Sequence, residues 1–254
     1  MKPSALVLAG SRGERDSVAL KENVSHKSLA LVEGETLLAR VIGALRDAGL
    51  TTISVSADDP DVMAEALRLG AEISPPESGP SGSVARGFAA SGAPLLVTTA
   101  DHALLRGEWV TSFIADLPAG ADIGVALAPR AAVEAAVPGS KRTYLKFADG
   151  EWSGCNLFLL ATPQAAQAIE AWRSVEANRK RPWRIAARLG VSTLWAYFRG
   201  RLTLDQAIVR LGKRLGVEAR LVPAKDGLAA VDVDKPQDLA EVRMIAATAK
   251  TRQR

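Results

Sequence analysis

The chain has 254 residues, a length that suits one large α/β domain or one domain with an appendage. Of these residues 48% are hydrophobic and 24% charged, which is ordinary for a soluble globular protein. Its single cysteine, Cys155, excludes an intramolecular disulfide framework and a cysteine-based zinc cluster, and its two histidines argue against a metal site built from histidine alone. No apolar run approaches the roughly 20 residues that span a bilayer, and the N-terminus passes directly into a strand, so we expect a cytoplasmic protein without a signal peptide.

The first half of the chain alternates strands and helices. Apolar runs that end at turn-forming residues predict strands over residues 5–9, 52–55, 71–74, 94–99 and 122–128. Helical spacing of apolar residues, with capping signals such as Asp59-Pro60, predicts helices over residues 37–45, 60–69, 83–90 and 109–117. This alternation predicts an α/β fold, a three-layer α/β/α sandwich with a mostly parallel central sheet of the Rossmann-like type.

The second half of the chain follows a different pattern. Alternating residues around the turn signal Asp149-Gly150 predict a hairpin of strands 142–147 and 153–160. A helix over 163–175, short basic helices within 180–215, strands over 217–222 and 228–233, and a closing helix over 236–249 follow. We expect one domain over residues 1–254, in which residues 163–216 form a basic helical insertion.

Basic residues concentrate in this second half. The chain carries a net charge of +4, yet residues 173–220 hold twelve Lys or Arg against three Asp or Glu, so the remainder is net negative. Such a charge imbalance indicates an anionic partner or an acidic substrate.

A polar loop after the first strand combines glycines with positive charges. Gly10 and Gly13 supply backbone N–H groups, and Arg12, Arg15 and the later Lys27 supply charge, a combination that favours a polyphosphate. The loop lacks the Gly-Lys-Ser/Thr of a P-loop and the third glycine of G-x-G-x-x-G. A plain turn between a strand and a helix is the alternative. We expect the long loop over residues 16–26 to be a lid and not part of the phosphate-binding loop itself.

Three aspartates follow apolar strands. Asp101 comes after the most apolar strand, and Asp232 and Asp234 end the segment before Pro236. The carboxyl ends of parallel strands line the ligand crevice, and Mg²⁺ prefers oxygen ligands, so these carboxylates are candidate metal ligands. Capping of the following helices is the alternative, which suits Asp234 better than Asp232.

Three ordered motifs together resemble the nucleotidyltransferases of the glycosyltransferase-A-like fold, which include the guanylyltransferases of molybdenum-cofactor synthesis. The opening motif of these enzymes, LAGG-x-G-x-R…PK-x-L…PLL, is similar to residues 8–15, 26–29 and 36–38. Their metal strand is similar to residues 100–105, and their closing motif D-x-x-TP-x-DL is similar to residues 232–239. Ser11, His26 and Ala103 depart from these motifs, but the charged positions are retained, so the departures affect the subfamily more than the reaction.

The resemblance implies a Mg²⁺-dependent enzyme that couples an NTP to a phosphorylated small acceptor (a sugar, polyol, isoprenoid or cofactor phosphate) and releases pyrophosphate. Arg15 and Lys27 would stabilise the phosphates, and Asp101, Asp232 and Asp234 would hold the metal. The nucleotide would contact Leu8, Ala9, Gly10, Ser11, Arg12, Gly13, Ser83 and Asp101. The acceptor would contact Lys141, Arg142, Lys146, Gly154 and Asn156.

The sequence leaves alternatives open for the identity of the nucleotide base and for the partners of the protein. Ser83-Val84 resembles the base-recognition turn of methylerythritol-phosphate cytidylyltransferases and favours CTP, with an ordinary helix cap as the alternative. The basic, aromatic segment 179–201 could bind an acceptor phosphate, contact a membrane surface, form a dimer face, or be a solvated helical subdomain. No nucleic-acid-reading motif is present, so we expect no nucleic-acid partner. A non-catalytic nucleotide-binding protein and a glycosyltransferase that uses a nucleotide sugar are the alternative functions.

Overall fold

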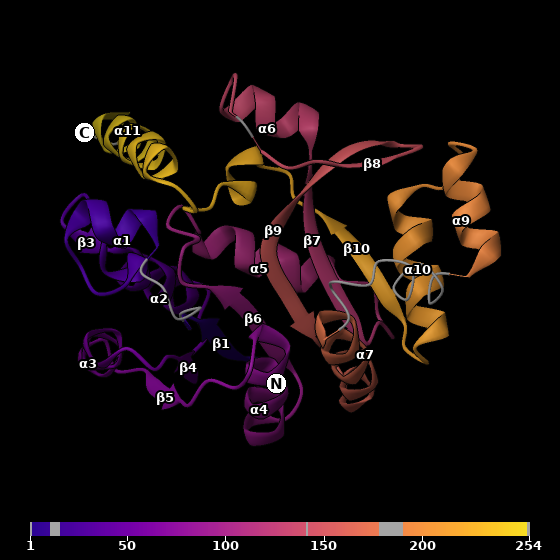
Figure 1. Ribbon diagram of the computed structural model, residues 1–254, viewed down its shortest axis with the longest axis horizontal. Helices are drawn as coiled ribbons and strands as arrows, with labels where there is room; N and C mark the ends of the chain where they lie inside the picture. The colour runs from indigo at the N-terminus through magenta and orange to yellow at the C-terminus, as the bar shows by residue number, and fades with distance from the viewer. Residues whose placement is uncertain (1, 11–15, 141, 178–189, 253–254) are drawn as a thin grey trace.

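A mixed sheet runs through the middle of the protein in the computed structural model, which describes residues 2–10, 16–140, 142–177 and 190–252 (Figure 1). Within these residues the sheet has eight strands in the order β10-β7-β9-β6-β1-β4-β5, with β8 paired to β9. The strands are β1 Ser4–Leu8, β4 Ile53–Ser56, β5 Glu72–Ser74, β6 Leu95–Thr99, β7 Ile123–Pro129, β8 Leu145–Phe147, β9 Gly150–Leu160 and β10 Ala219–Pro223. Two further short strands, β2 Leu31–Val32 and β3 Glu35–Thr36, form a separate antiparallel pair.

Most strands of the main sheet are parallel, as the alternation of strands and helices predicts. β1 pairs in parallel with β4 and β6, and β10 pairs in parallel with β7. The exception is β9, which runs antiparallel between β6 and β7 because the β8–β9 hairpin returns the chain into the sheet. The hairpin prediction is confirmed, although its first strand is shorter than expected.

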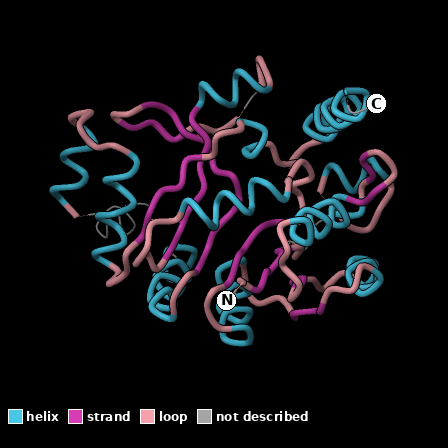
Figure 2. Tube along the Cα trace, turned by 180° about the vertical axis from the view of Figure 1, so that it is seen from behind, coloured by secondary structure: helices cyan, strands magenta, loops and turns pink. Residues whose placement is uncertain are grey.

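Helices cover both faces of the sheet (Figure 2). Apolar residues of α2, α3 and α5 pack on one face, and those of α4, α7 and α10 pack on the other. The predicted three-layer α/β/α architecture is therefore confirmed. The described helices are α1 Ser17–Glu22, α2 Leu37–Asp47, α3 Pro60–Arg68, α4 Pro80–Ser91, α5 Gly107–Asp116, α6 Arg130–Ala136, α7 Ala166–Ala177, α9 Val191–Phe198, α10 Leu204–Arg214 and α11 Pro236–Arg252, with 3₁₀ helices η1 Lys27–Leu29, η2 Pro163–Ala165 and η3 Gly227–Ala230.

The C-terminal helix α11 packs beside the N-terminal part of the chain (Figure 1). Its buried Leu239 and Val242 share an apolar cluster with Val18 of α1, and Arg243 forms an ion pair with Glu22 at 2.6 Å. We expected residues 16–26 to be a long loop, serving as a lid. Instead, Asp16 caps a helix whose apolar side is buried under α11, so this segment is part of the core.

The predicted strand over residues 228–233 is wrong. Residues 227–230 form the 3₁₀ helix η3, which begins where the Asp226 carboxylate accepts a hydrogen bond from the Leu228 amide. A short apolar run marks a buried segment but does not distinguish an extended from a helical backbone, and here the Asp-Gly sequence starts a turn.

The described part of the basic insertion consists of α7, α9 and α10, whereas residues 178–189 lie outside the described residues. α9 exposes Trp195 and Phe198 to solvent, and the Arg199 guanidinium lies 3.8 Å from the centre of the Trp195 ring. No described helix is long and apolar enough to cross a membrane. The membrane contact and the dimer face remain predictions.

Two helical glycines differ in how closely the backbone around them is packed. A Cβ at Gly212 of α10 would lie 2.7 Å from the Val217 carbonyl oxygen and 2.9 Å from the Ala219 amide nitrogen, whereas a Cβ at Gly43 of α2 would meet nothing within 4 Å. Gly212 therefore lets α10 approach β10.

We predict that Gly212→Ala lowers the free energy of unfolding by about 1–3 kcal/mol, because the new methyl group overpacks a contact with backbone atoms. The matched Gly43→Ala should raise this free energy by roughly 0.5–1 kcal/mol through helix propensity. Urea unfolding of both variants measures the difference. Equal effects of the two substitutions would contradict the close approach of α10 to the sheet.

Candidate functional site

The ends of β1 and β6 lie side by side and carry the loops that the motifs identify. Leu8 pairs with Thr99 in the parallel register, and the Ala100 amide donates to the Leu8 carbonyl oxygen at 3.0 Å. The loop that begins at Gly10 and the segment with Asp101 therefore leave the same edge of the sheet. Ser11, Arg12, Gly13 and Arg15 lie outside the described residues, so their contacts with a nucleotide remain predictions.

Lys27 connects this edge to the segment that precedes α11. Its ammonium lies 2.7 Å from Asp101 Oδ2, 3.1 Å from Asp234 Oδ1 and 3.0 Å from the Val233 carbonyl oxygen. These three acceptors match the three protons of an ammonium group. Burial opposes the charged form, but the negative charges and hydrogen bonds of Asp101 and Asp234 outweigh it and raise the Lys27 pKa above its ordinary value.

Local structure fixes the position of Lys27. Lys27 is the first residue of η1, and the His26 side chain caps η1 by accepting a hydrogen bond from the Ser28 amide at 3.1 Å. Ser28 itself is fully buried. His26 replaces the proline of the family motif and supplies a cap that proline does not have.

Asp101 is held on both of its carboxylate oxygens. The Thr99 hydroxyl donates to Oδ1, Lys27 contacts Oδ2, and the side chain is only 13% exposed. Asp101 does not cap the next helix, because α5 has Arg106 at its N-cap position. The capping alternative for Asp101 is therefore wrong.

Both carboxylate oxygens of Asp232 also accept hydrogen bonds, here from side chains of other parts of the chain. Its Oδ1 accepts from Arg142 at 2.6 Å and its Oδ2 accepts from Asn156 at 2.9 Å. Its pKa is raised by desolvation and then by the negative charges of Asp234 and Asp101, against the opposing effects of Arg142 and Asn156. The carboxylates of Asp101, Asp232 and Asp234 thus lie close enough to repel one another.

Asp234 is directed at Lys27. The cap before α11 comes instead from Asp238, whose carboxylate accepts from the Asp234 and Lys235 amides. The capping alternative for Asp234 is therefore wrong, because the helix supplies its own capping carboxylate from its first turn.

Arg142 has a different position from the one expected of an acceptor-binding residue. Its side chain is 6% exposed, and its guanidinium contacts Asp232 and, at 3.2 Å, Glu241 of α11. No local pattern in the sequence indicates this link, because Glu241 is about 100 residues away and lies on a helix that looks ordinary. Arg142 fixes the Asp232 carboxylate in place.

The other predicted acceptor residues are spread over the β8–β9 hairpin. Asn156 has a left-handed backbone with φ of 48°, and its side chain reaches Asp232. Gly154 lies next to the irregular pairing of β7 and β9. Lys146 is exposed and pairs with Glu151 at 3.2 Å, and Lys141 lies outside the described residues. The structure thus joins Asn156 to the aspartates and leaves Lys146 on the surface.

Ser83 lies in the first turns of α4 and is not its cap. The helix begins at Pro80 with Gly79 as the N-cap, and the Ser83 hydroxyl accepts from the Glu77 amide at 3.1 Å. The alternative that Ser83 is an ordinary helix cap is therefore wrong. Its contact fastens the loop before α4 to the helix.

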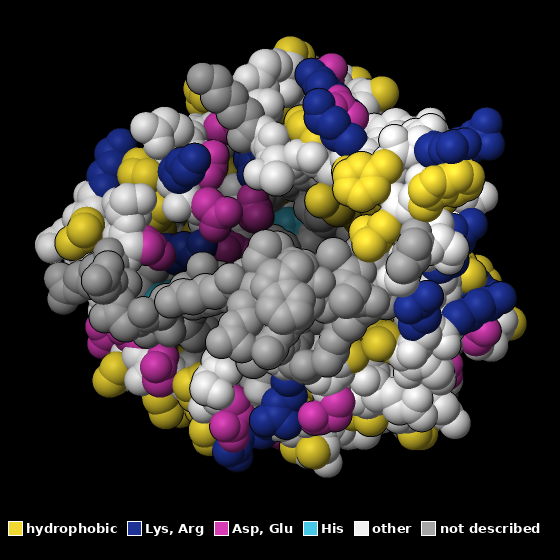
Figure 3. Space-filling model, turned by 45° about the vertical axis from the view of Figure 1, so that its right-hand side comes forward, with side chains coloured by type: hydrophobic (Ala, Val, Ile, Leu, Met, Phe, Trp, Pro, Cys, Tyr) yellow, Lys and Arg dark blue, Asp and Glu magenta, His cyan; other side chains and the backbone are white. Residues whose placement is uncertain are grey.

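The aspartates fit a magnesium ion that is completed by other ligands. Among the described residues, no group of three or more His, Cys, Asp or Glu is arranged to hold a metal alone. Mg²⁺ commonly binds one or two carboxylates together with water and substrate phosphates, and each carboxylate oxygen here has a further lone pair. Figure 3 shows acidic side chains gathered in a hollow of the surface, which agrees with such a site.

We predict that Asp232→Asn gains stability relative to the wild type as the pH rises. A carboxyl group with a raised pKa in the folded chain contributes its full stability below the unfolded value of 3.8 and loses it as the pH rises through the folded pKa. Asparagine does not titrate and has no such loss. Urea unfolding with a metal chelator from pH 4 to pH 7 measures this difference in stability.

Asp205→Asn, at an exposed position of α10, is the control for the removal of one negative charge. A fall in the stability of Asp232→Asn relative to the wild type as the pH rises would contradict the raised pKa of Asp232.

Comparisons with known proteins agree with this geometry. Residues 5–191, more than half of the chain, match the model of the MobA-like NTP transferase domain. A search of curated proteins found no significant match.

Solved structures with similar folds include several transferases. A hypothetical transferase from Thermus thermophilus is 31% identical with a TM-score of 0.81, over 94% of this chain and 100% of that chain. A CMP:2-keto-3-deoxy-manno-octonic acid synthetase complexed with CTP is 17% identical with a TM-score of 0.60, over 98% of this chain and 100% of that chain. A 2-C-methyl-D-erythritol 4-phosphate cytidylyltransferase, also from Thermus thermophilus, is 19% identical with a TM-score of 0.54, over 97% of this chain and 100% of that chain. At 17% and 19% identity, the last two structures show that the fold is similar and no more than that.

The match to the family model covers the Gly10 loop, Lys27, Asp101 and the β8–β9 hairpin, which contribute most of the residues around the aspartates. It favours an enzyme over a non-catalytic nucleotide-binding protein. The chain belongs to the MobA-like NTP transferase family and is a nucleotidyltransferase.

Proposed function

We propose that this enzyme transfers a nucleotidyl group from CTP to a phosphorylated small molecule, with Mg²⁺, at the cluster of Lys27, Asp101, Asp232 and Asp234. In this reaction an oxygen of the acceptor phosphate attacks the α-phosphorus of the nucleotide, the bond from that phosphorus to the bridging oxygen breaks, and pyrophosphate leaves. The observation that carries the proposal is a lysine of η1 held together with the carboxylate that follows β6 and the carboxylates that precede α11, beside the ends of β1 and β6.

The protein itself takes little part in the bond making and breaking of such a transfer. A phosphate monoester is already anionic near neutral pH, so the acceptor needs no general base. Positioning of the two phosphates and neutralisation of their charge supply the catalysis. The backbone amides of the predicted phosphate-binding loop over Gly10–Gly13, together with Arg15, would hold the β- and γ-phosphates.

Lys27 would neutralise charge on the α-phosphate as it builds up. To do so, the ammonium has to exchange one carboxylate for a phosphate oxygen. Asp234 is the partner that it would release, because the Asp234 side chain is 66% exposed whereas that of Asp101 is 13% exposed. The hydrogen bond from Lys27 to the Val233 carbonyl oxygen can remain and keep the ammonium in place.

Asp101 and Asp232 would hold the metal ion. Bound Mg²⁺ would neutralise the triphosphate and orient it for attack. Arg142 and Asn156 keep the Asp232 carboxylate oriented, and Thr99 does the same for Asp101. Asp234 becomes available as a third carboxylate once Lys27 turns to the phosphate.

CTP is the proposed nucleotide for two reasons. Ser83 lies buried in the first turns of α4, where the sequence resembles a cytidylyltransferase turn. Two structures with similar folds are named for cytidylyl chemistry or for a complex with CTP. The acceptor would lie against the β8–β9 hairpin near Asn156 and Gly154, with Lys141 and Lys146 close to its phosphate. Sugar, polyol, isoprenoid and cofactor phosphates all meet this description.

We expect pyrophosphate release with CTP and Mg²⁺ when a panel of these acceptors is supplied, and slower release with GTP, UTP or ATP. Asp101→Asn should lower kcat by at least about 100-fold, because the carboxylate acts on charge that develops during transfer. Asp205→Asn removes an exposed carboxylate of α10 and should leave kcat within about twofold, as surface substitutions usually do.

Full activity of Asp101→Asn would rule out the proposed site. Faster release with GTP would overturn the choice of CTP and leave the site intact. Transfer of a sugar from a nucleotide sugar, with release of a nucleoside diphosphate, would identify the glycosyltransferase alternative.

A further inference from the structure

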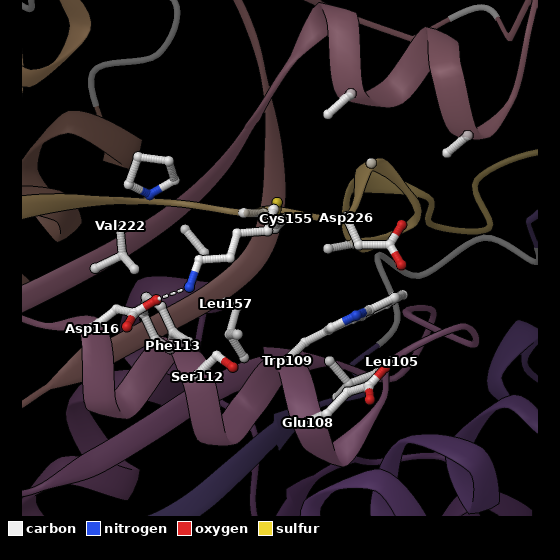
Figure 4. A pocket seen from close by; sticks show the side chains of 18 of the residues that line it. Leu105, Glu108, Trp109, Ser112, Phe113, Asp116, Cys155, Leu157, Val222 and Asp226 are labelled. Carbon is white, nitrogen blue, oxygen red and sulfur yellow. Dashed lines mark hydrogen bonds and ion pairs between the residues drawn. The ribbon is translucent and has the colours of Figure 1, made fainter.

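A cavity lies beside α5, and neither Lys27 nor the three aspartates around it line this cavity. It encloses about 600 Å³ between α5, α6, η3 and the strands β7, β9 and β10. This volume is in the range of cavities that hold small organic molecules. Figure 4 shows Phe113 and Trp109 of α5 facing Leu157 of β9 and Val222 of β10 across it.

The cavity has an unsatisfied polar group in its wall. His102 lines it, is 1% exposed, and has no hydrogen-bond partner for either ring nitrogen among the described residues. The backbone of Ala229 lies near the ring but does not reach hydrogen-bond geometry. A buried polar group without a partner is costly, so a ligand that hydrogen-bonds to His102 would remove that cost.

The charges around the cavity already have partners. Lys225 pairs with Asp116 at 2.9 Å, and Arg106 lies 3.5 Å from Glu108 and 3.7 Å from Asp226. The rest of the wall is mostly apolar and includes Cys155 of β9 and three alanines of α6, Ala132, Ala135 and Ala136. An uncharged molecule suits this lining, because a charged one would lose its hydration without gaining an ionic partner.

The cavity and the nucleotide cluster use different side chains of the same strand. Cys155 and Leu157 line the cavity and belong to the core on the α5 side, whereas Asn156 between them donates to Asp232. A molecule in the cavity would therefore not occupy the place of a triphosphate at Lys27.

We propose that this cavity is a binding site for a small, uncharged, mostly apolar molecule with one hydrogen-bonding group, which His102 would recognise. The hydrogen-bonding group would meet the buried imidazole while the apolar body fills the space beside Trp109 and Phe113. An ordered water is the other way to satisfy the imidazole, and such a water would not discriminate between apolar molecules.

The test uses 2-naphthol and naphthalene, which share one ring system and differ by a hydroxyl group. Saturation-transfer NMR with the full chain should show saturable binding of 2-naphthol, and binding of naphthalene weaker by about tenfold, the size expected for one buried hydrogen bond. His102→Phe should remove this difference between the two molecules. CTP with Mg²⁺ should not displace 2-naphthol.

Ala135→Phe tests the same site without changing a buried residue. Ala135 is exposed on α6 and lines the cavity, so the larger side chain should weaken 2-naphthol binding at least about tenfold by filling the space. Ala131→Phe, one turn earlier on the same helix and outside the lining, should change binding by less than about twofold. Absence of saturable binding, equal binding in the two α6 variants, or displacement by CTP would each overturn the proposal.

Discussion

The site depends on one ammonium group. Lys27 contacts the Asp101 carboxylate after β6 and also the Asp234 carboxylate and the Val233 carbonyl group before α11, which follow Lys27 by more than 200 residues in the chain. A backbone hydrogen bond from the Val233 amide to the Asp101 carbonyl oxygen runs alongside, at 3.1 Å. These contacts hold the closing segment at the strand ends, together with those of Asp232 to Arg142 and Asn156.

The charged cluster around Lys27 suits substrate binding but lowers the stability of the free enzyme. Three carboxylates lie together in a partly buried place, where desolvation first and the negative charges of Asp234 and Asp101 second raise the pKa of Asp232. Lys27 and the buried Arg142 offset part of the cost in the free enzyme. A substrate with phosphates and a divalent cation supplies the same kinds of charge and can take over these contacts. Residues that bind a substrate commonly lower the stability of the free protein in this way.

Patterns within one segment predicted much of the fold. The alternation of strands and helices, the Asp59-Pro60 cap and the Asp149-Gly150 hairpin all depend on neighbouring residues, and the structure contains each of them. Asp101 and Lys27 could be identified because each belongs to a motif near the end of a strand.

The features that the sequence did not reveal depend on contacts between distant segments. The contact of Arg142 with Glu241 joins two segments about 100 residues apart. α1 was taken for a loop because its apolar side is short and becomes buried only when α11 packs on it. η3 was taken for a strand because a buried apolar run has no period of its own. The cavity beside His102 likewise forms only when α5, α6 and β10 come together.

The most direct measurement is a crystal structure of the full chain with CTP and Mg²⁺. The account predicts that Lys27 leaves Asp234 and contacts a phosphate oxygen, while Asp101 and Asp232 bind the metal ion. A structure in which the triphosphate lies elsewhere, with Lys27 still on both Asp101 and Asp234, would contradict it.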